Sequence, residues 1–195
     1  MNQKVNLDEI FEIKSGYHLA RRMDDLEKGD NEQIVKVLSN KGFRIDDELE
    51  INEEEINVGS IGEENFTHEN DIILTTIVPV KSRFITKEDE GILIPTGFMV
   101  LRVKDKTKYD PEFISYLLNY KGIQQQLLLY SGDSTIPRLT KKNLHEVKFT
   151  LPDIEIQKKY ATLIRMINMR IQIKEKSIEN DKLLTTGLLE KALGI

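Results

Sequence analysis

Cysteine is absent from this sequence of 195 residues, which excludes disulfide bonds, thiolate metal sites and thiol nucleophiles. Long apolar runs are absent too, because no segment approaches the ~18 apolar residues that a membrane helix needs. The N-terminal residues do not combine a basic end with an apolar run, as an export signal does. We therefore expect a soluble, cytoplasmic protein without a membrane partner.

Familiar catalytic and cofactor motifs are also missing. The sequence has no Walker loop, no Gly-x-Gly-x-x-Gly turn and no Gly-x-Ser-x-Gly elbow. Its three histidines, His18, His68 and His145, are far apart in sequence, and none belongs to a His-x-x-x-His pair. We expect no catalytic residue, no metal site and no cofactor.

One catalytic alternative stays open. Asp133 followed by Glu146-x-Lys148 resembles the Asp and Glu-x-Lys of two-carboxylate nucleases, in which carboxylates hold Mg²⁺ and the lysine steadies the attacking water. Charged residues make up 31% of the chain, so Glu-x-Lys arises easily by chance, and it recurs at Glu12 to Lys14. A Mg²⁺-dependent nuclease is therefore kept as an alternative function.

Charge is distributed unevenly along the chain. The net charge is −5, yet residues 136–195 contain 12 Lys and Arg against 7 Asp and Glu, so the rest of the chain is strongly acidic. Much of that acidity lies in Asp46–Glu55, which we interpret as a solvated loop. An acidic body argues against DNA contact over the whole surface. It also leaves a second alternative, an interaction protein that binds no DNA and occupies the DNA groove of a partner.

The pattern of apolar residues predicts an α+β fold with a mostly β domain over residues 1–150. Asp110 as an N-cap followed by Pro111 predicts one or two helices up to about Tyr130. A loop with a short helical turn follows, and then a strand that Pro152 ends. Runs rich in Val, Ile, Phe and Thr predict strands at 33–39, 71–80, 82–85, 97–103 and 146–151.

Residues 151–195 predict one long helix with a short C-terminal tail. After the expected N-cap Asp153 there is no Pro or Gly until about Thr186, which is enough for a helix of roughly 50 Å. Along this helix, residues alternate by four and three, the spacing of a coiled-coil seam that requires a partner helix. The seam consists of Tyr160, Ile164, Ile167, Ile171, Lys174, Ile178 and Asp181.

Two charged residues interrupt the seam. Lys174 and Asp181 lower its stability but fix register and orientation, and they approach each other in an antiparallel pair of helices. Met166, Met169 and Ile173 form a second apolar strip on roughly the opposite side. This strip predicts packing on the β domain or, alternatively, a second partner.

From Gly91 onward, and most densely over Ser131–Ile164, the sequence resembles one half of a type I restriction-modification specificity subunit. The family pattern is a Gly-Ser-Thr turn, a basic loop with Leu, an Ile/Val-rich strand ending in Leu-Pro, and Glu-x-Gln opening a helix. The phrases "STIPRL", "NLHEVKFTLP" and "IEIQKKYA" match it. "IFEIKSGY" resembles the start of a recognition domain.

This resemblance implies a non-catalytic DNA-recognition subunit. In the family, a target-recognition domain contacts double-stranded DNA, and its long helix spaces it from a second domain by antiparallel pairing. This chain has one domain and one helix, so we expect a half-length form that dimerises to read a bipartite site. The implied partners are methylation subunits, which use S-adenosylmethionine, and through the complex a restriction subunit, which uses ATP.

Candidate DNA contacts fall into two clusters, one after the first strand and one in the Ser131–Ile164 stretch, with Arg83 apart from both. Phosphates are contacted by Lys, Arg and small hydroxyl groups, whereas reading of bases requires side chains that reach groove edges. Pro137 and Leu139, within the second cluster, are expected to pack. The candidates are Lys14, Ser15, Tyr17, His18, Arg21, Arg22, Arg83, Ser134, Thr135, Arg138, Lys141 and Lys142.

Overall fold

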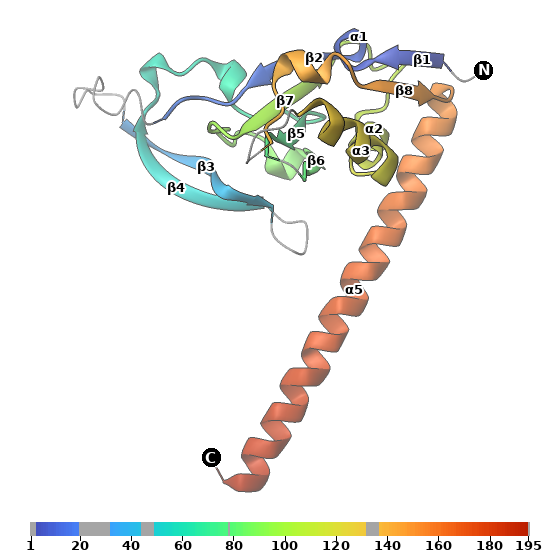
Figure 1. The fold of residues 1–195 in the computed structure, drawn as a ribbon. Coiled ribbons are helices and arrows are strands. Elements are labelled where there is room, and N and C mark those ends of the chain that lie inside the picture. The colour runs from blue at the N-terminus through green and yellow to red at the C-terminus, as the bar shows by residue number, and fades with distance from the viewer. Residues whose placement is uncertain (1–2, 20–31, 44–48, 78, 132–136, 195) are drawn as a thin grey trace.

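A mixed α+β domain and one long helix that projects from it make up the protein (Figure 1). The helix, α5 (Ile154–Leu193), follows the last strand and extends far beyond the domain. The predicted α+β class with a long C-terminal helix is therefore confirmed. The computed structural model describes residues 3–19, 32–43, 49–77, 79–131 and 137–194.

The remaining elements are short, apart from one long hairpin. In the described ranges the strands are β1 (Gln3–Asn6), β2 (Phe11–Ser15), β3 (Glu32–Phe43), β4 (Leu49–Asn57), β5 (Ile72–Thr75), β6 (Ser82–Phe84), β7 (Phe98–Val103) and β8 (Lys148–Leu151). The domain's helices are α1 (Leu7–Ile10), α2 (Pro111–Leu118), α3 (Lys121–Tyr130) and α4 (Lys141–Leu144), with 3-10 turns at Val58–Ser60, Glu63–Asn65 and Lys87–Asp89.

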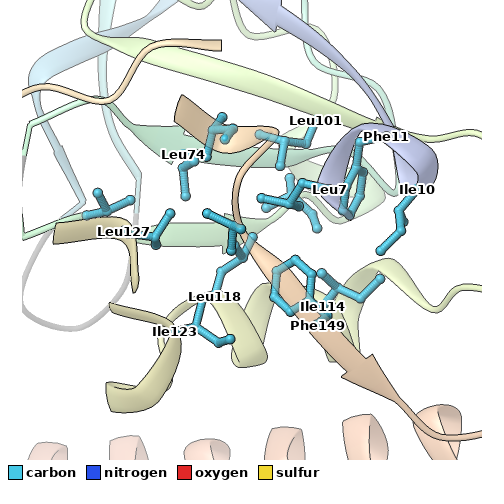
Figure 2. Close-up of a cluster of buried hydrophobic side chains, with 14 of the residues drawn as sticks. Leu7, Ile10, Phe11, Leu74, Leu101, Ile114, Leu118, Ile123, Leu127 and Phe149 are labelled. Atoms are coloured by element: carbon cyan, nitrogen blue, oxygen red, sulfur yellow. The ribbon is translucent and has the colours of Figure 1, made fainter. Parts of the chain in front are cut away.

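Four strands form a central antiparallel sheet in the order β2-β7-β5-β6. Ile72, Ile73 and Leu74 of β5 are all buried, so both faces of this sheet are covered. Figure 2 shows the cluster on one face, where Leu74 and Leu101 meet side chains from α1, α2, α3 and β8. On the other face, Ile73 packs with residues of β3 and with the segment that precedes β7. Burial on both faces explains the uninterrupted apolar run in β5.

The predicted N-cap at Asp110 and the predicted short helical turn are both confirmed. The Asp110 side chain accepts a hydrogen bond from the amide of Phe113 at 2.7 Å, and Pro111 is the first residue of α2. The predicted short helical turn is α4, which Thr140 and Asn143 close with a capping box. Strand β8 then pairs with β1, which joins the two ends of the domain.

The expectation of a solvated loop over Asp46–Glu55 is wrong for its second half. Leu49–Asn57 forms β4, which pairs with β3 to make the long curved hairpin in Figure 1. Lys36 lies opposite Glu53 in this pairing, so cross-strand charge attraction favours a strand that the acidic composition alone does not suggest. Asp46–Glu48 lie outside the described residues.

Helix α5 is longer than predicted, because Gly187 does not end it. A glycine inside a helix costs about 1 kcal/mol, which the neighbouring turns tolerate. The helix ends instead at Gly194, whose φ of 73° is the left-handed conformation of a C-terminal cap. Asp153 occupies the N-cap position as predicted, but its side chain accepts no hydrogen bond from the first turn. At 1.5 Å per residue, the helix is roughly 60 Å long.

The second apolar strip does not pack on the β domain. Met166, Met169 and Ile173 are 60%, 54% and 68% exposed. Only Met169 lies beside the domain, at the rim of a groove between α5 and α2. No helix in the described ranges combines the length and apolar character needed to cross a membrane.

Gln157 and Ala161 are the only buried residues in α5, so the helix contacts the domain mainly through its first turns. About one turn beyond Ala161, Arg165 Nη1 lies 3.1 Å from Glu112 Oε2 on α2. Glu112 also accepts a hydrogen bond from the Tyr116 hydroxyl at 3.0 Å. Burial raises the pKa of Glu112 above its ordinary value of 4.5, while the Tyr116 hydrogen bond and the Arg165 charge oppose that rise.

Gly16 lies where two backbone segments approach closely. Its amide donates to the carbonyl oxygen of Phe98 at 3.0 Å. A Cβ atom at Gly16 would collide with the carbonyl group of Pro95. This close contact explains why the "SGY" motif has a glycine, and not a residue with a side chain, at position 16.

Gly16→Ala is expected to lower the free energy of unfolding by about 1–3 kcal/mol, because the added methyl group overpacks a backbone contact. Urea denaturation measures the change. Gly187→Ala is the control, since it adds a methyl group in open space on α5 and is expected to stabilise the helix by about 0.5–1 kcal/mol. Equal midpoints for Gly16→Ala and the wild type would contradict the prediction.

Glu112→Gln is expected to remove a pH-dependent contribution to stability. The folded-state pKa of Glu112 is raised, so its contribution is fully present below 4.5 and is lost as the pH rises through the folded-state value. The wild type should therefore gain stability relative to Glu112→Gln as the pH falls from 7 towards 4.5. Urea midpoints across this range test it, with the exposed Glu155→Gln as background. A pH-independent difference between wild type and Glu112→Gln would refute the prediction.

Candidate nucleic-acid interface

The described parts of the two predicted DNA-binding clusters, around Tyr17 and Arg138, are joined to one end of the central sheet. The amide of Thr96 donates to the carbonyl oxygen of Tyr17 at 3.0 Å, which attaches the first cluster to the segment before β7. The amide of Thr76 donates to the Gly97 carbonyl at 2.9 Å, and the amide of Leu139 donates to the Thr76 carbonyl at 2.8 Å. The loop that contains Arg138 is thereby fixed to the same place.

A basic hollow lies beside this junction. Its volume is about 480 Å³, and three exposed cations, Lys41, Lys81 and Arg138, line it together with Thr75 and Thr96. None of the described residues that line it is acidic. Apolar side chains complete the hollow, namely Phe43, Ile77, Pro79 and Phe98. A concave surface with three cations and two hydroxyl groups can hold phosphate oxygens.

The long hairpin brings Lys41 to the hollow. Gly42 has a φ of 73°, and a Cβ atom there would lie 3.0 Å from the Phe98 ring, so glycine allows the chain to pass the ring closely. The rings of Phe43 and Phe98 then pack with centroids 6.3 Å apart. The Lys41 side chain remains 80% exposed and lies 3.2 Å from Glu50. An exposed pair of this kind contributes little to stability, so Glu50 does not hold Lys41 strongly.

Loop structure positions the other two cations. Lys81 precedes β6, and its amide donates to the Thr75 hydroxyl at 2.8 Å. Arg138 forms an isolated antiparallel bridge with Ile77. Leu139, next to it, is buried as predicted, so its side chain anchors the loop while that of Arg138 faces solvent.

The other candidates that the structure describes do not line the hollow. Lys14 lies 3.4 Å from Glu12, and Ser15 and His18 are exposed near the Tyr17 junction. Arg83 is 3.2 Å from Asp89 and lies in the groove beside α5. Lys141 and Lys142 are exposed on α4. All of these stay predictions, and four further candidates lie outside the described residues, namely Arg21, Arg22, Ser134 and Thr135.

Sequence reasoning missed Lys41 and Lys81. Both are single lysines with no basic neighbour in the adjacent positions, so no local charge cluster marks them. The available signal was Gly42, because a glycine inside an otherwise strand-like run often marks a bulge or a close backbone approach. Only the fold places these lysines next to Arg138.

The predicted seam of α5 is largely exposed. Tyr160, Ile167, Ile171 and Ile178 are 51%, 57%, 47% and 55% exposed. Ile164 is half-buried, because it lines the groove of about 710 Å³ between α5, α2 and β6. Lys174 and Asp181 are exposed as well, and Leu188, 60% exposed, lies about two turns beyond Asp181 on the same side. An apolar stripe of this length on a projecting helix is typical of an interaction surface.

The nuclease alternative gains no support from the described residues. Glu146 precedes β8 and Lys148 is its first residue; both are exposed, and Asp133 lies outside the described ranges. Within those ranges no group of three His, Asp or Glu side chains is arranged to hold a metal ion.

Comparison with known proteins gives consistent matches. Residues 2–180 match the family described as the Type I restriction modification DNA specificity domain. Over 75 residues, 38% of this chain, it is 35% identical to a putative type I restriction enzyme MjaX specificity subunit of Methanocaldococcus jannaschii, of which the match covers 17%. It is 32% identical over 108 residues, 55% of this chain, to the type I restriction enzyme MjaIX specificity subunit of the same organism, of which the match covers 24%.

Two solved structures share the fold. The HsdS subunit from Thermoanaerobacter tengcongensis has a TM-score of 0.66 at 17% identity, with 98% of this chain and 48% of that chain covered. The type I restriction-modification S subunit from M. genitalium has a TM-score of 0.59 at 19% identity, covering 97% and 45%. This chain thus spans about half the length of these solved chains. Because the family match extends over nearly the whole sequence, the protein belongs to the type I restriction modification DNA specificity domain family.

Proposed function

We propose that this chain is a DNA-recognition half subunit of a type I restriction-modification complex, and that it contacts double-stranded DNA at the basic hollow. The observation that carries the proposal is the meeting of Lys41, Lys81 and Arg138 around one hollow in an otherwise acidic domain. The segments of both predicted clusters are joined at the same end of the sheet. In this proposal the domain has a recognition role and no catalytic one.

Phosphate contact is the part of DNA binding that the hollow explains. Three cations around a concave surface neutralise several phosphates, and each neutralised phosphate makes binding more sensitive to salt. Thr75 and Thr96 add hydroxyl groups at the same surface. Base reading requires further side chains, for which the exposed residues around Tyr17 and on α4 are the candidates.

Two copies of the chain complete the bipartite reader. An antiparallel pair of α5 helices centred near Ile178 brings Lys174 of each copy beside Asp181 of the other and places Ile167 near Leu188. This arrangement buries exposed apolar residues and pairs the two seam charges. A two-fold axis then puts one domain at each end, so that the helices set the separation of the half-sites.

The chemistry of the complex is assigned to partner subunits. Methylation subunits, which use S-adenosylmethionine, dock on the dimer, and a restriction subunit, which uses ATP, joins through the complex. In this proposal the chain supplies the sequence specificity of the complex and needs no cofactor of its own.

Replacement of Lys41, Lys81 and Arg138 by Ala is expected to weaken DNA binding and to reduce its salt dependence. Each lost phosphate contact lowers the slope of log K against log salt by about 0.9, so the triple variant should lose up to about 2.7. Fluorescence anisotropy in a salt titration measures it, with methylation subunits present and a target identified by methylation-site sequencing.

The control for this prediction removes three exposed lysines elsewhere, Lys87, Lys106 and Lys121, and should keep the wild-type slope. Equal slopes for both triple variants would contradict the assignment of the hollow. Competition with DNA for the methylation subunit, without DNA affinity, would instead favour the acidic interaction protein.

Ile167→Asp combined with Ile178→Asp is expected to convert the dimer to single chains, because four carboxylates in the paired seam are costly to bury. Light scattering gives the mass, and circular dichroism checks that the helix persists. Met166→Asp with Ile173→Asp, on the opposite strip, should remain dimeric. A wild-type protein that stays a single chain at high concentration would refute the homodimer.

A further inference from the structure

We propose that Gln157 is a positioning residue that fixes the angle between the domain and α5. Its effect on the separation of half-sites rests on the proposed function, whereas its effect on the angle does not. The inference starts from how little of the helix the domain contacts, since only Gln157 and Ala161 are buried in α5. The direction of the whole helix is therefore decided at its first turns.

The Gln157 side chain uses both ends of its amide. Its Oε1 accepts from the amide of Asp110 at 3.0 Å, and its Nε2 donates to the carbonyls of Lys108 at 3.1 Å and Pro152 at 2.8 Å. Two of these partners belong to the segment that enters α2, and the third belongs to the link between β8 and α5. One side chain, 1% exposed, thus joins three backbone groups from two separate segments.

This geometry is specific for a glutamine. Each of the three bonds satisfies a backbone group at a junction where a missing partner would be costly. A glutamate lacks the two N–H donors and would place a carboxylate against two carbonyl oxygens. An alanine would leave all three backbone groups without this partner. The amide therefore holds both segments in one relative orientation.

Two further contacts continue the same side of the helix at intervals of four residues. Ala161 is 1% exposed, and its small side chain lets α5 approach the domain closely. Arg165 then pairs with Glu112 at 3.1 Å. These contacts span about 12 Å of a helix roughly 60 Å long. From Ile164 onward, a groove of about 710 Å³ lies between α5, α2 and β6, and the α5 residues that line it are not buried.

The first turns of α5, from Gln157 to Arg165, form the root of the helix. A small change of angle at this root displaces the far end of α5 by a large distance. A rotation of about 10° displaces the end of a rod of roughly 60 Å by about 10 Å. With a rise of about 3.4 Å per base pair, this equals about three base pairs of DNA. In a dimer, loss of the Gln157 contacts would therefore change or broaden the gap between half-sites.

The angle can be measured directly because the chain has no cysteine. Cysteines introduced at the exposed Glu69 and Glu179 carry spin labels, and pulsed EPR gives their separation after dilution with unlabelled protein. The wild type should show one narrow distance distribution. Gln157→Ala should shift or broaden it by about 6 Å, the displacement that 10° produces over the roughly 33 Å between positions 157 and 179.

Two companion variants separate positioning from folding. Gln126→Ala removes a side-chain amide that also bonds backbone, at Lys148 within the domain, and should leave the distribution unchanged. Arg165→Ala removes the exposed outer contact, keeps the domain folded, and should broaden the distribution less than Gln157→Ala does. If Gln157→Ala does not fold, Arg165→Ala still tests the root. Unchanged distributions for the folded root variants overturn the proposal.

Methylation-site sequencing with the methylation subunits tests the consequence for DNA. Gln157→Ala should methylate sites with altered or more varied gaps, whereas simple destabilisation would lower methylation at every gap alike. A shifted EPR distribution with an unchanged gap would overturn the link to spacing. If the wild type directs no methylation, the proposed function fails, and the EPR result still decides the role of Gln157.

Discussion

Burial of the central sheet on both faces is the constraint on which the rest of the domain depends. Ile72 and Leu74 need a cover on one side, which α1, α2, α3 and β8 provide, while Ile73 needs a cover on the other, where β3 lies. The hairpin of β3 and β4 therefore has to pack against this second face of the sheet. Because β3 passes close to the Phe98 ring at Gly42, it also places Lys41 at the hollow.

The acidic composition and the basic hollow are compatible because they occupy different places. The glutamates of β4 lie along a projecting hairpin, where strand pairing and solvent accommodate them. The cations of the hollow come from three separate segments and meet only at the sheet end. A net charge of −5 therefore says little about the local field at that end, since screening in solution limits each group's influence to about 10 Å.

The helix and the domain meet different requirements. A packed domain buries its apolar residues internally, but α5 leaves a stripe from Tyr160 to Leu188 exposed, which only another surface can cover. The root of the helix compensates for its small contact area with directional bonds through Gln157. Hydrogen bonds to three backbone groups define an angle, whereas apolar contact alone permits sliding and rotation.

The sequence by itself determined the α+β class, the helix start after Pro152, the N-cap at Asp110 and the apolar spacing of α5. Each of these depends on neighbours within a few residues along the chain, or on a repeat of three to four residues. Tertiary structure decided the strand made from an acidic run and the meeting of Lys41, Lys81 and Arg138. These depend on contacts between segments that are distant in sequence, and no local pattern records which distant segments will be brought together.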